Sequence, residues 1–169
     1  MKVRTSLKEE IHFLMEDEEW KNKSRIYGEV VERWLCKNQS CPSCGRRSLH
    51  QLKINTPFTD LRCDACGAEF QVKASSKGFL NRHTGTFNKL PGASYLKSLE
   101  GLQETNRPDW ILVEYCRENE EIKSALLIDH RHVTKESLIP RNPLSQNARR
   151  SGWQGCTWDF RNTPYARLI

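Results

Sequence analysis

The sequence predicts one α/β domain, in which a central mixed sheet is flanked by helices and carries an embedded cluster of four cysteines. Three observations predict it: helical spacing of apolar residues near the N-terminus, two closely spaced cysteine pairs, and two apolar runs typical of buried strands in the second half. The length of 169 residues suffices for one domain with a sizeable core.

The segment from Leu7 to Trp34 predicts two amphipathic helices, or one helix broken near Asn22. Ser24 is a reasonable N-cap for the second helix. We therefore separate a helical segment, residues 1–23, from the main domain, residues 24–169. The apolar positions recur at intervals of three and four residues: Ile11, Leu14, Met15, Ile26, Val30 and Trp34.

Short strands are expected on either side of the cysteines, over residues 49–54 and 59–63, and again over residues 69–73. In the last of these, side chains alternate between the two faces. One face receives Phe70 and Val72, and the other receives Glu69, Gln71 and Lys73.

Residues 74–92 are rich in Ser, Gly, Asn and Thr, and predict a mobile loop. A short helical pattern follows, formed by Tyr95, Leu99 and Leu102. The nearly continuous apolar runs 110–116 and 124–128 then predict strands that are covered on both faces.

The composition excludes some classes of protein. No run of 18 apolar residues exists, and the N-terminus lacks the apolar stretch of a signal peptide, so we expect a cytoplasmic protein. The formal charge of +6 fits either a polyanionic partner or an ordinary solvated surface. Seven cysteines in a reducing compartment favour metal binding over disulfides.

Four cysteines form two chelating pairs, Cys41 with Cys44 and Cys63 with Cys66, with 18 residues between the pairs. This spacing is typical of a tetrahedral zinc site, whereas a redox-active motif needs only one pair. A glycine follows each pair, as expected where the backbone must adopt a positive φ. Four sulfur ligands leave no open position, so this zinc should be structural and not catalytic.

A second pattern lies beside these cysteines: Asp60, and then Gln71-Val72-Lys73 on the expected strand. An acid on one strand and an acid or amide two residues before a lysine on the next provide oxygen ligands for Mg²⁺ and a cation near an attacking water. An exposed strand face with no such role explains the same residues, so both interpretations stay open at this point.

Three stretches resemble the catalytic domain of the DpnI-type restriction endonucleases, which are PD-(D/E)xK nucleases with a four-cysteine zinc site inside the core. They are SRIYGEVVERWLCKNQSCPSCG, TDLRCDACGAEFQVKASSKG and NPLSQNARRSGWQGCTWDF. The resemblance covers residues 24–160 and implies a PD-(D/E)xK nuclease domain over residues 24–169, with a zinc knuckle at residues 41–66. It implies Mg²⁺-dependent, sequence-specific cleavage of both strands of DNA, with a site carrying N6-methyladenine as one alternative.

Carried over residue by residue, the family's metal-binding Asp falls on Asp60 and its catalytic Lys on Lys73. Gln71 stands where the family has Glu, so one negative charge is missing, although an amide oxygen can still ligate Mg²⁺, as in the similar Mrr-like nucleases. The resemblance further implies that the carbonyl of Val72 ligates Mg²⁺. Glu69 shares the face of Gln71 and is a further candidate ligand.

The resemblance also points to residues that contact DNA. Near the C-terminus, guanidinium, amide and indole groups suit phosphates, base edges and a methyl group, with a helix cap and a buried Trp as the structural alternative. In the predicted loop, basic side chains suit phosphates. The candidates are Arg149, Arg150, Trp153, Gln154, Lys77 and Arg82.

Two other functions remain open: a zinc-containing DNA-binding protein that has lost catalysis, and a nuclease of the same fold in repair or mobile-element processing. Family members carry a winged-helix domain after the catalytic one, whereas this sequence ends at Ile169. Either the winged-helix domain lies outside this sequence or the catalytic domain reads its site alone.

Overall fold

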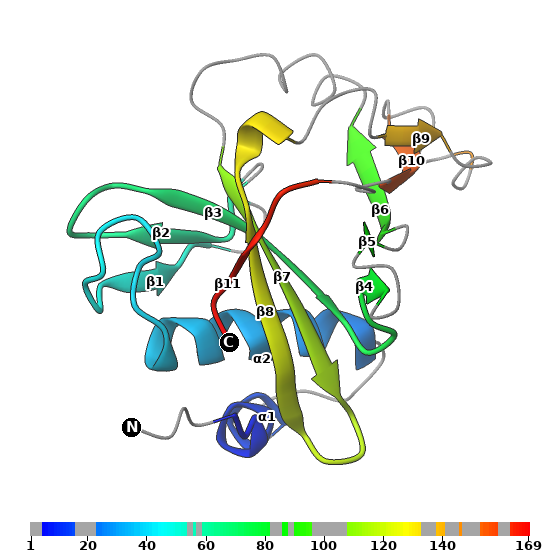
Figure 1. Ribbon diagram of the computed structural model, residues 1–169. Helices are drawn as coiled ribbons and strands as arrows, with labels where there is room; N and C mark the ends of the chain where they lie inside the picture. Colours follow the sequence, from blue (N-terminus) through cyan, green and yellow to red (C-terminus); the bar gives the residue numbers. More distant parts are fainter. Residues whose placement is uncertain are drawn as a thin grey trace.

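A six-stranded mixed sheet forms the centre of the computed structural model, with the strand order β1-β2-β3-β7-β8-β11 (Figure 1). The structure describes residues 5–15, 23–53, 56, 59–81, 86–87, 90–95, 108–132, 138–140, 146, 153–158 and 163–169. The elements are α1 (Lys8–Met15), α2 (Lys23–Asn38), β1 (Leu49–Gln51), β2 (Leu61–Cys63), β3 (Glu69–Ser75), β4 (Leu80–Asn81), β5 (Thr86–Phe87), β6 (Leu90–Tyr95), β7 (Asp109–Cys116), β8 (Glu121–Ile128), the 3₁₀ helix η1 (His130–His132), β9 (Leu138–Pro140), β10 (Trp153–Trp158) and β11 (Ala166–Arg167).

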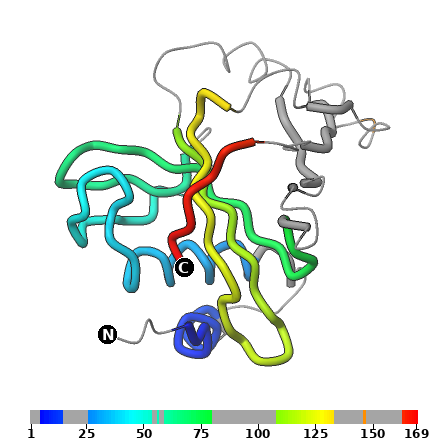
Figure 2. Tube along the Cα trace, viewed as in Figure 1, coloured from blue at the N-terminus to red at the C-terminus, as the bar shows by residue number. Residues whose placement is uncertain are grey.

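The sheet is mixed, as predicted. The first three strands form an antiparallel meander, β3 then pairs parallel to β7, and β7, β8 and β11 are again antiparallel. Figure 2 follows the chain through this path, with β11 near the C-terminus lying along β8. Two further sheets, β6-β10-β9 and β4-β5, complete the described strands.

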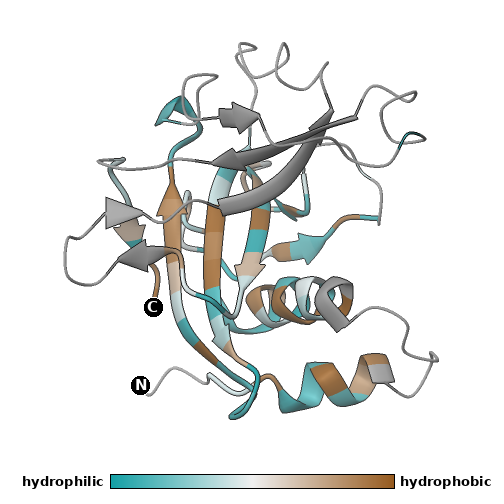
Figure 3. Ribbon diagram, turned by 90° about the vertical axis from the view of Figure 1, so that its right-hand side faces the viewer, coloured by the Kyte–Doolittle hydropathy of each residue, from teal (hydrophilic) through white to brown (hydrophobic). Residues whose placement is uncertain are grey.

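The core on one face of the sheet forms against α2. Its stripe of Val30, Val31, Trp34 and Leu35 is fully buried and packs in one cluster with Phe70 of β3 and with other side chains. In the described part of the chain, α1 and α2 lie on the same side of the sheet (Figure 3).

The central strands are buried on both faces. Every residue of β7 from Trp110 to Tyr115 is buried, and so are Leu126 and Ile128 of β8. Apolar colour therefore runs along most of both strands in Figure 3. This confirms the prediction from their continuous apolar runs.

The N-terminal segment is joined to the main sheet. Ser6 forms an antiparallel bridge with Glu121, and the Leu7 amide donates to the Glu120 carbonyl at 2.7 Å. Leu7 and Ile11 are buried in the same cluster as α2. The division between residues 1–23 and 24–169 stays a prediction.

Local predictions differ from the structure in three places. Ser24 lies inside α2, which begins at Lys23, so it is not the N-cap.

Residues 74–92 were expected to form a loop, but β3 extends to Ser75, and β4, β5 and the start of β6 lie in this range. Tyr95 ends β6 instead of starting a helix, because β6 pairs with β10 over its whole length. Such long-range pairing overrides local propensity; Leu99 and Leu102 lie outside the described residues.

None of the helices in the described part of the chain is both long enough and apolar enough to cross a membrane.

Candidate functional site

Two matching turns hold the four cysteines. In the first turn, the Cys41 amide donates to the Arg46 carbonyl and the Gly45 amide donates to the Cys41 carbonyl. In the second turn, the Cys63 and Gly67 amides make the equivalent bonds, and all four bonds are 2.8 Å long. Gly45 and Gly67 each have φ = 74°, as predicted from the glycine after each pair. The sequence Cys-x-x-Cys-Gly therefore forms the same turn twice.

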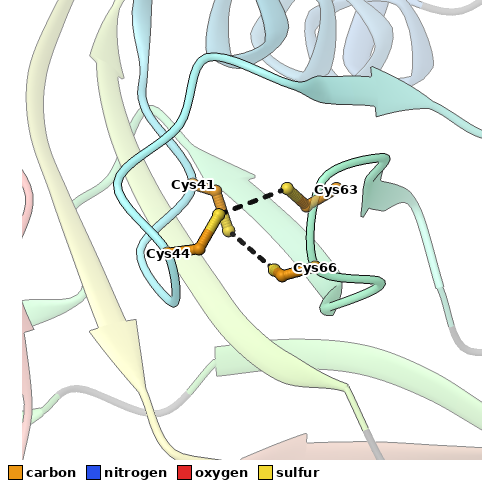
Figure 4. A group of neighbouring side chains, drawn as sticks. All are labelled: Cys41, Cys44, Cys63 and Cys66. Carbon is orange, nitrogen blue, oxygen red and sulfur yellow. Dashed lines mark hydrogen bonds between the residues drawn. The ribbon is translucent and has the colours of Figure 1, made fainter.

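The turns aim their sulfurs at one point (Figure 4). Sγ of Cys41 lies 3.7 Å from Sγ of Cys66, Sγ of Cys44 lies 3.7 Å from Sγ of Cys63, and all four sulfurs lie within 4.8 Å of one another. A zinc ion with Zn–S bonds of about 2.3 Å requires tetrahedral sulfur separations of about 3.8 Å. The donor set and its spacing therefore fit one tetrahedral metal ion.

The surroundings favour the thiolate of one cysteine, Cys63, whereas burial and neighbouring sulfurs raise the pKa values of the Cys41 and Cys66 thiols. Burial raises the pKa of the Cys63 thiol, but the backbone amides of Cys66 and Ala65 and the neighbouring sulfurs more than offset it and lower that pKa to about 7. Metal ligation requires deprotonated sulfur, so these amides prepare a ligand.

Asp60 lies where β2 diverges from β3. Its amide donates to the Phe70 carbonyl at 2.9 Å, and its carbonyl accepts from the Leu52 amide at 2.8 Å. The β2–β3 ladder includes the pair Leu61–Phe70 but does not reach Val72. The Asp60 carboxylate fills this gap: Oδ2 accepts from the Val72 amide at 2.7 Å and from Gln71 Nε2 at 2.6 Å.

Lys73 completes the group. It shares the face of Gln71 by strand alternation, and its Nζ lies 5.8 Å from the centroid of the Trp110 ring. Burial raises the pKa of the Asp60 carboxyl, while the Val72 amide and the Lys73 charge oppose this rise. The structure thus brings together Asp60, Gln71, Val72 and Lys73.

Glu69 shares the predicted face but has other partners. Its Oε2 accepts from the Thr59 hydroxyl at 3.2 Å, and its Oε1 lies 4.0 Å from Nε of Arg62. Thr59 and Arg62 thus hold the side chain that was a candidate ligand.

Glu32 on α2 was missed by reasoning from the sequence. Its Oε2 accepts from Gln51 Nε2 at 2.6 Å, and burial followed by the charge of Asp60 raises the pKa of Glu32 to about 7. One feature of the sequence could have indicated Glu32: it is an acid between Val31 and Trp34, two apolar positions of an amphipathic helix.

A second group that can hold a metal is formed by Asp109, Asp129 and His130, whose ligand atoms lie within 4.8 Å of one another. Asp109 Oδ1 contacts both the amide and Nδ1 of His130, at 2.8 and 2.7 Å. Arg131 binds Asp129 through Nε and Nη2. The two carboxylates therefore accept from backbone amides of η1, which lies where β7 begins and β8 ends. This structural role explains why the three side chains lie together.

The predicted DNA-contacting residues are only partly described. Lys77 is exposed, and its amide donates to the Ser75 hydroxyl at 3.1 Å. Trp153 and Gln154 lie in β10, opposite Tyr95 and Ser94 of β6, so position 153 is not a helix cap. Arg82, Arg149 and Arg150 lie outside the described residues.

Comparison with known proteins agrees with these features. Residues 10–169 match a protein family described as the DpnI, Dam-replacing family. The match includes both cysteine pairs, Asp60 and the Gln71-Val72-Lys73 strand. Because it spans nearly the whole sequence, the chain belongs to the DpnI (Dam-replacing) family.

Proposed function

We propose that this chain is a Mg²⁺-dependent endonuclease of the PD-(D/E)xK type that cuts double-stranded DNA. Family membership suggests a DNA function related to restriction endonucleases and implies DNA binding. The observation that carries the proposal is the contact of the Asp60 carboxylate with Gln71 and Val72, beside Lys73.

Each residue of the group has a chemical role. Asp60 supplies a carboxylate, Gln71 an amide oxygen and Val72 a carbonyl, all of which are oxygen ligands that suit Mg²⁺. Bound Mg²⁺ would polarise the scissile phosphate. Lys73 orients the attacking water as an ammonium, or deprotonates it as a neutral amine, and its ammonium form offsets charge on the phosphate.

We propose that the four cysteines hold a structural zinc, because all four ligand positions are sulfur and none is left for water. This ion would join the turn before β1 to the turn between β2 and β3. It would thereby hold Asp60, which directly precedes β2, against β3.

DNA recognition stays a proposal with its candidates unchanged. Trp153 is the side chain we expect against a methyl group if the site contains N6-methyladenine, because an indole offers a flat apolar face. The others suit phosphates or base edges: Arg149, Arg150, Gln154, Lys77 and Arg82.

The test digests fully methylated and unmethylated genomic DNA with Mg²⁺ and sequences the ends. A single consensus at the ends supports a restriction endonuclease, and its appearance only in modified DNA identifies a methylation requirement. Lys73→Ala should lower cleavage at least about a hundredfold while DNA binding persists. Lys123→Ala, an exposed lysine on β8, is the control. Absence of cleavage on every DNA would reject the proposal.

A second function, a zinc-containing DNA-binding protein without catalysis, is favoured by one observation, the neutral Gln71 in place of an acid. Such a protein would bind DNA in a gel-shift assay, show no Mg²⁺-dependent cleavage, and lose nothing in the Lys73→Ala variant.

A further inference from the structure

Glu32 and Asp60 contact the same short chain segment, Glu32 from a different element. The Glu32 side chain extends from α2, which contacts both β1 and β3, and its Oε2 accepts a hydrogen bond from Gln51 Nε2 at 2.6 Å. Gln51 pairs across strands with Leu61, the residue after Asp60. The next residue along the chain, Leu52, donates its amide to the Asp60 carbonyl. Two adjacent residues of one chain segment thus contact Glu32 and Asp60.

This position lies at an edge of β3 where side chains from the two faces of the sheet can meet. The core against α2 contains Phe70 and Val72, whereas Gln71 and Lys73 belong to the opposite face. Because β2 leaves β3 after the Leu61–Phe70 pair, the Asp60 carboxylate lies in the opened edge. A side chain from the helix can meet side chains of the other face there.

The surroundings of Glu32 disfavour a charged side chain. Burial and the charge of Asp60 both raise the pKa of Glu32, so its ionised form is disfavoured, and the Lys73 charge opposes this only in part. An amide would accept the Gln51 hydrogen bond without that repulsion. Unfavourable electrostatics of this kind are concentrated at functional sites.

The charges of the candidate site point to what Glu32 contributes. Asp60 supplies one negative charge, Lys73 one positive charge, and Gln71 none. A site for a divalent cation ordinarily uses one or two carboxylates together with the phosphate of the substrate. Position 71 lacks the second carboxylate, and Glu32 brings one to the same edge of the sheet.

We propose that Glu32 supplies the second carboxylate of the divalent-cation site, in place of the charge that Gln71 lacks. This inference rests on the proposed nuclease function and identifies a further residue of the same site. Each carboxylate is held by the amide of a glutamine, Asp60 by Gln71 and Glu32 by Gln51, both at 2.6 Å. Gln51 is then a positioning residue for Glu32.

The first test measures binding of Mn²⁺ alone to the zinc-loaded full chain, by calorimetry and by electron paramagnetic resonance. Glu32→Gln keeps the size and the acceptor for Gln51 and removes only the charge. We expect its affinity for Mn²⁺ to fall at least tenfold and Mg²⁺-dependent cleavage to be lost. Glu118→Gln, an exposed acid in the turn between β7 and β8, should bind Mn²⁺ as the native chain does.

A second variant shows whether the lost charge, and not the fold, is responsible. Adding Gln71→Glu to the Glu32→Gln chain should recover Mn²⁺ affinity to within a few fold of native, because a carboxylate returns to the site from β3. Thermal melting of every variant is recorded without Mn²⁺, and we expect Glu32→Gln to melt no lower than the native chain.

The outcomes separate this inference from the proposed function. Native Mn²⁺ affinity in Glu32→Gln overturns the inference, and so does a native chain that binds no Mn²⁺. Cleavage by the native chain with equal cleavage by Glu32→Gln overturns the inference and leaves the nuclease intact. Absence of cleavage by the native chain, with Mn²⁺ binding that depends on Glu32, rejects the nuclease and supports the cation site.

Discussion

The cysteine cluster and the Asp60 group lie in the same three-stranded meander but are built differently. Each cysteine pair lies in one turn of six residues, 41–46 or 63–68, that is closed by two hydrogen bonds within the turn. Asp60, by contrast, is joined to β3 through its side chain, and Glu32 reaches this region from α2. The first site is closed by four sulfurs, and the second is assembled at an open edge. Local turns suit a structural ion, whereas a reaction needs groups that converge from several elements.

The largest expected effect is at the closed site. Cys63→Ser removes one sulfur and should abolish binding of the metal, which we expect to be one zinc per chain, because a buried ligand cannot be replaced by water without opening the cluster. Most of the free energy of unfolding should be lost with the metal. Metal analysis together with circular dichroism checks this, and Cys116→Ser is the matched control. A stable Cys63→Ser protein that retains its zinc would remove the structural role of the cluster.

A smaller effect is expected from Gln71→Glu at the open site. In the native chain, Gln71 Nε2 donates to the Asp60 carboxylate at 2.6 Å; a glutamate there places two carboxylates in contact. Without Mg²⁺ the variant should lose roughly 1–3 kcal/mol of stability, and with Mg²⁺ it should regain it. Urea unfolding with and without Mg²⁺ measures both values. If Mg²⁺ stabilises native and variant chains equally, position 71 does not face the cation.

The pH dependence of the free energy of unfolding should reveal the contribution of Glu32. Its pKa rises from an ordinary 4.5 to about 7 in the folded chain, so the protonated form is favoured by folding. Stability from this group is fully present below pH 4.5 and is lost as pH rises to about 7, by an amount on the order of 2 kcal/mol.

Urea unfolding of native and Glu32→Gln chains from pH 4.5 to pH 8, without Mg²⁺, provides the comparison. The difference between the two curves cancels the groups that titrate independently of Glu32, and it should favour the variant increasingly toward pH 8. Parallel curves would show that Glu32 titrates normally. The groups that act on it are Asp60, Gln51, Glu29 and Lys73.

The smallest effect is expected from Glu69→Gln. The described contacts of Glu69 are with Thr59 and Arg62, so we expect its charge to lie outside the Asp60 group. Unfolding free energy should change by less than about 0.5 kcal/mol, and Mn²⁺ affinity and cleavage should stay within about twofold of native. A tenfold loss of Mn²⁺ affinity would instead identify Glu69 as a ligand and would weaken the assignment of Glu32.

Predictions from the sequence succeeded where the determining interactions are local or repetitive. The helices around Ile11 and Val30 and the buried strands β7 and β8 follow from periodicity, and the face of Phe70 and Val72 follows from alternation. The loop expected over residues 74–92 was wrong, because β6 is stabilised by pairing with β10, some sixty residues away. Low strand propensity did not reveal that pairing.

The sequence by itself determined the cysteine turns, the alternation along β3 and the family. Each depends on residues close together in the chain or on a pattern read directly from it. Only the tertiary structure decided that Asp60 fills the gap beside Val72, that Glu69 contacts Thr59, and that Glu32 contacts Gln51. These contacts depend on where β2 leaves β3 and where α2 crosses the sheet, and both positions are set by packing of the whole core.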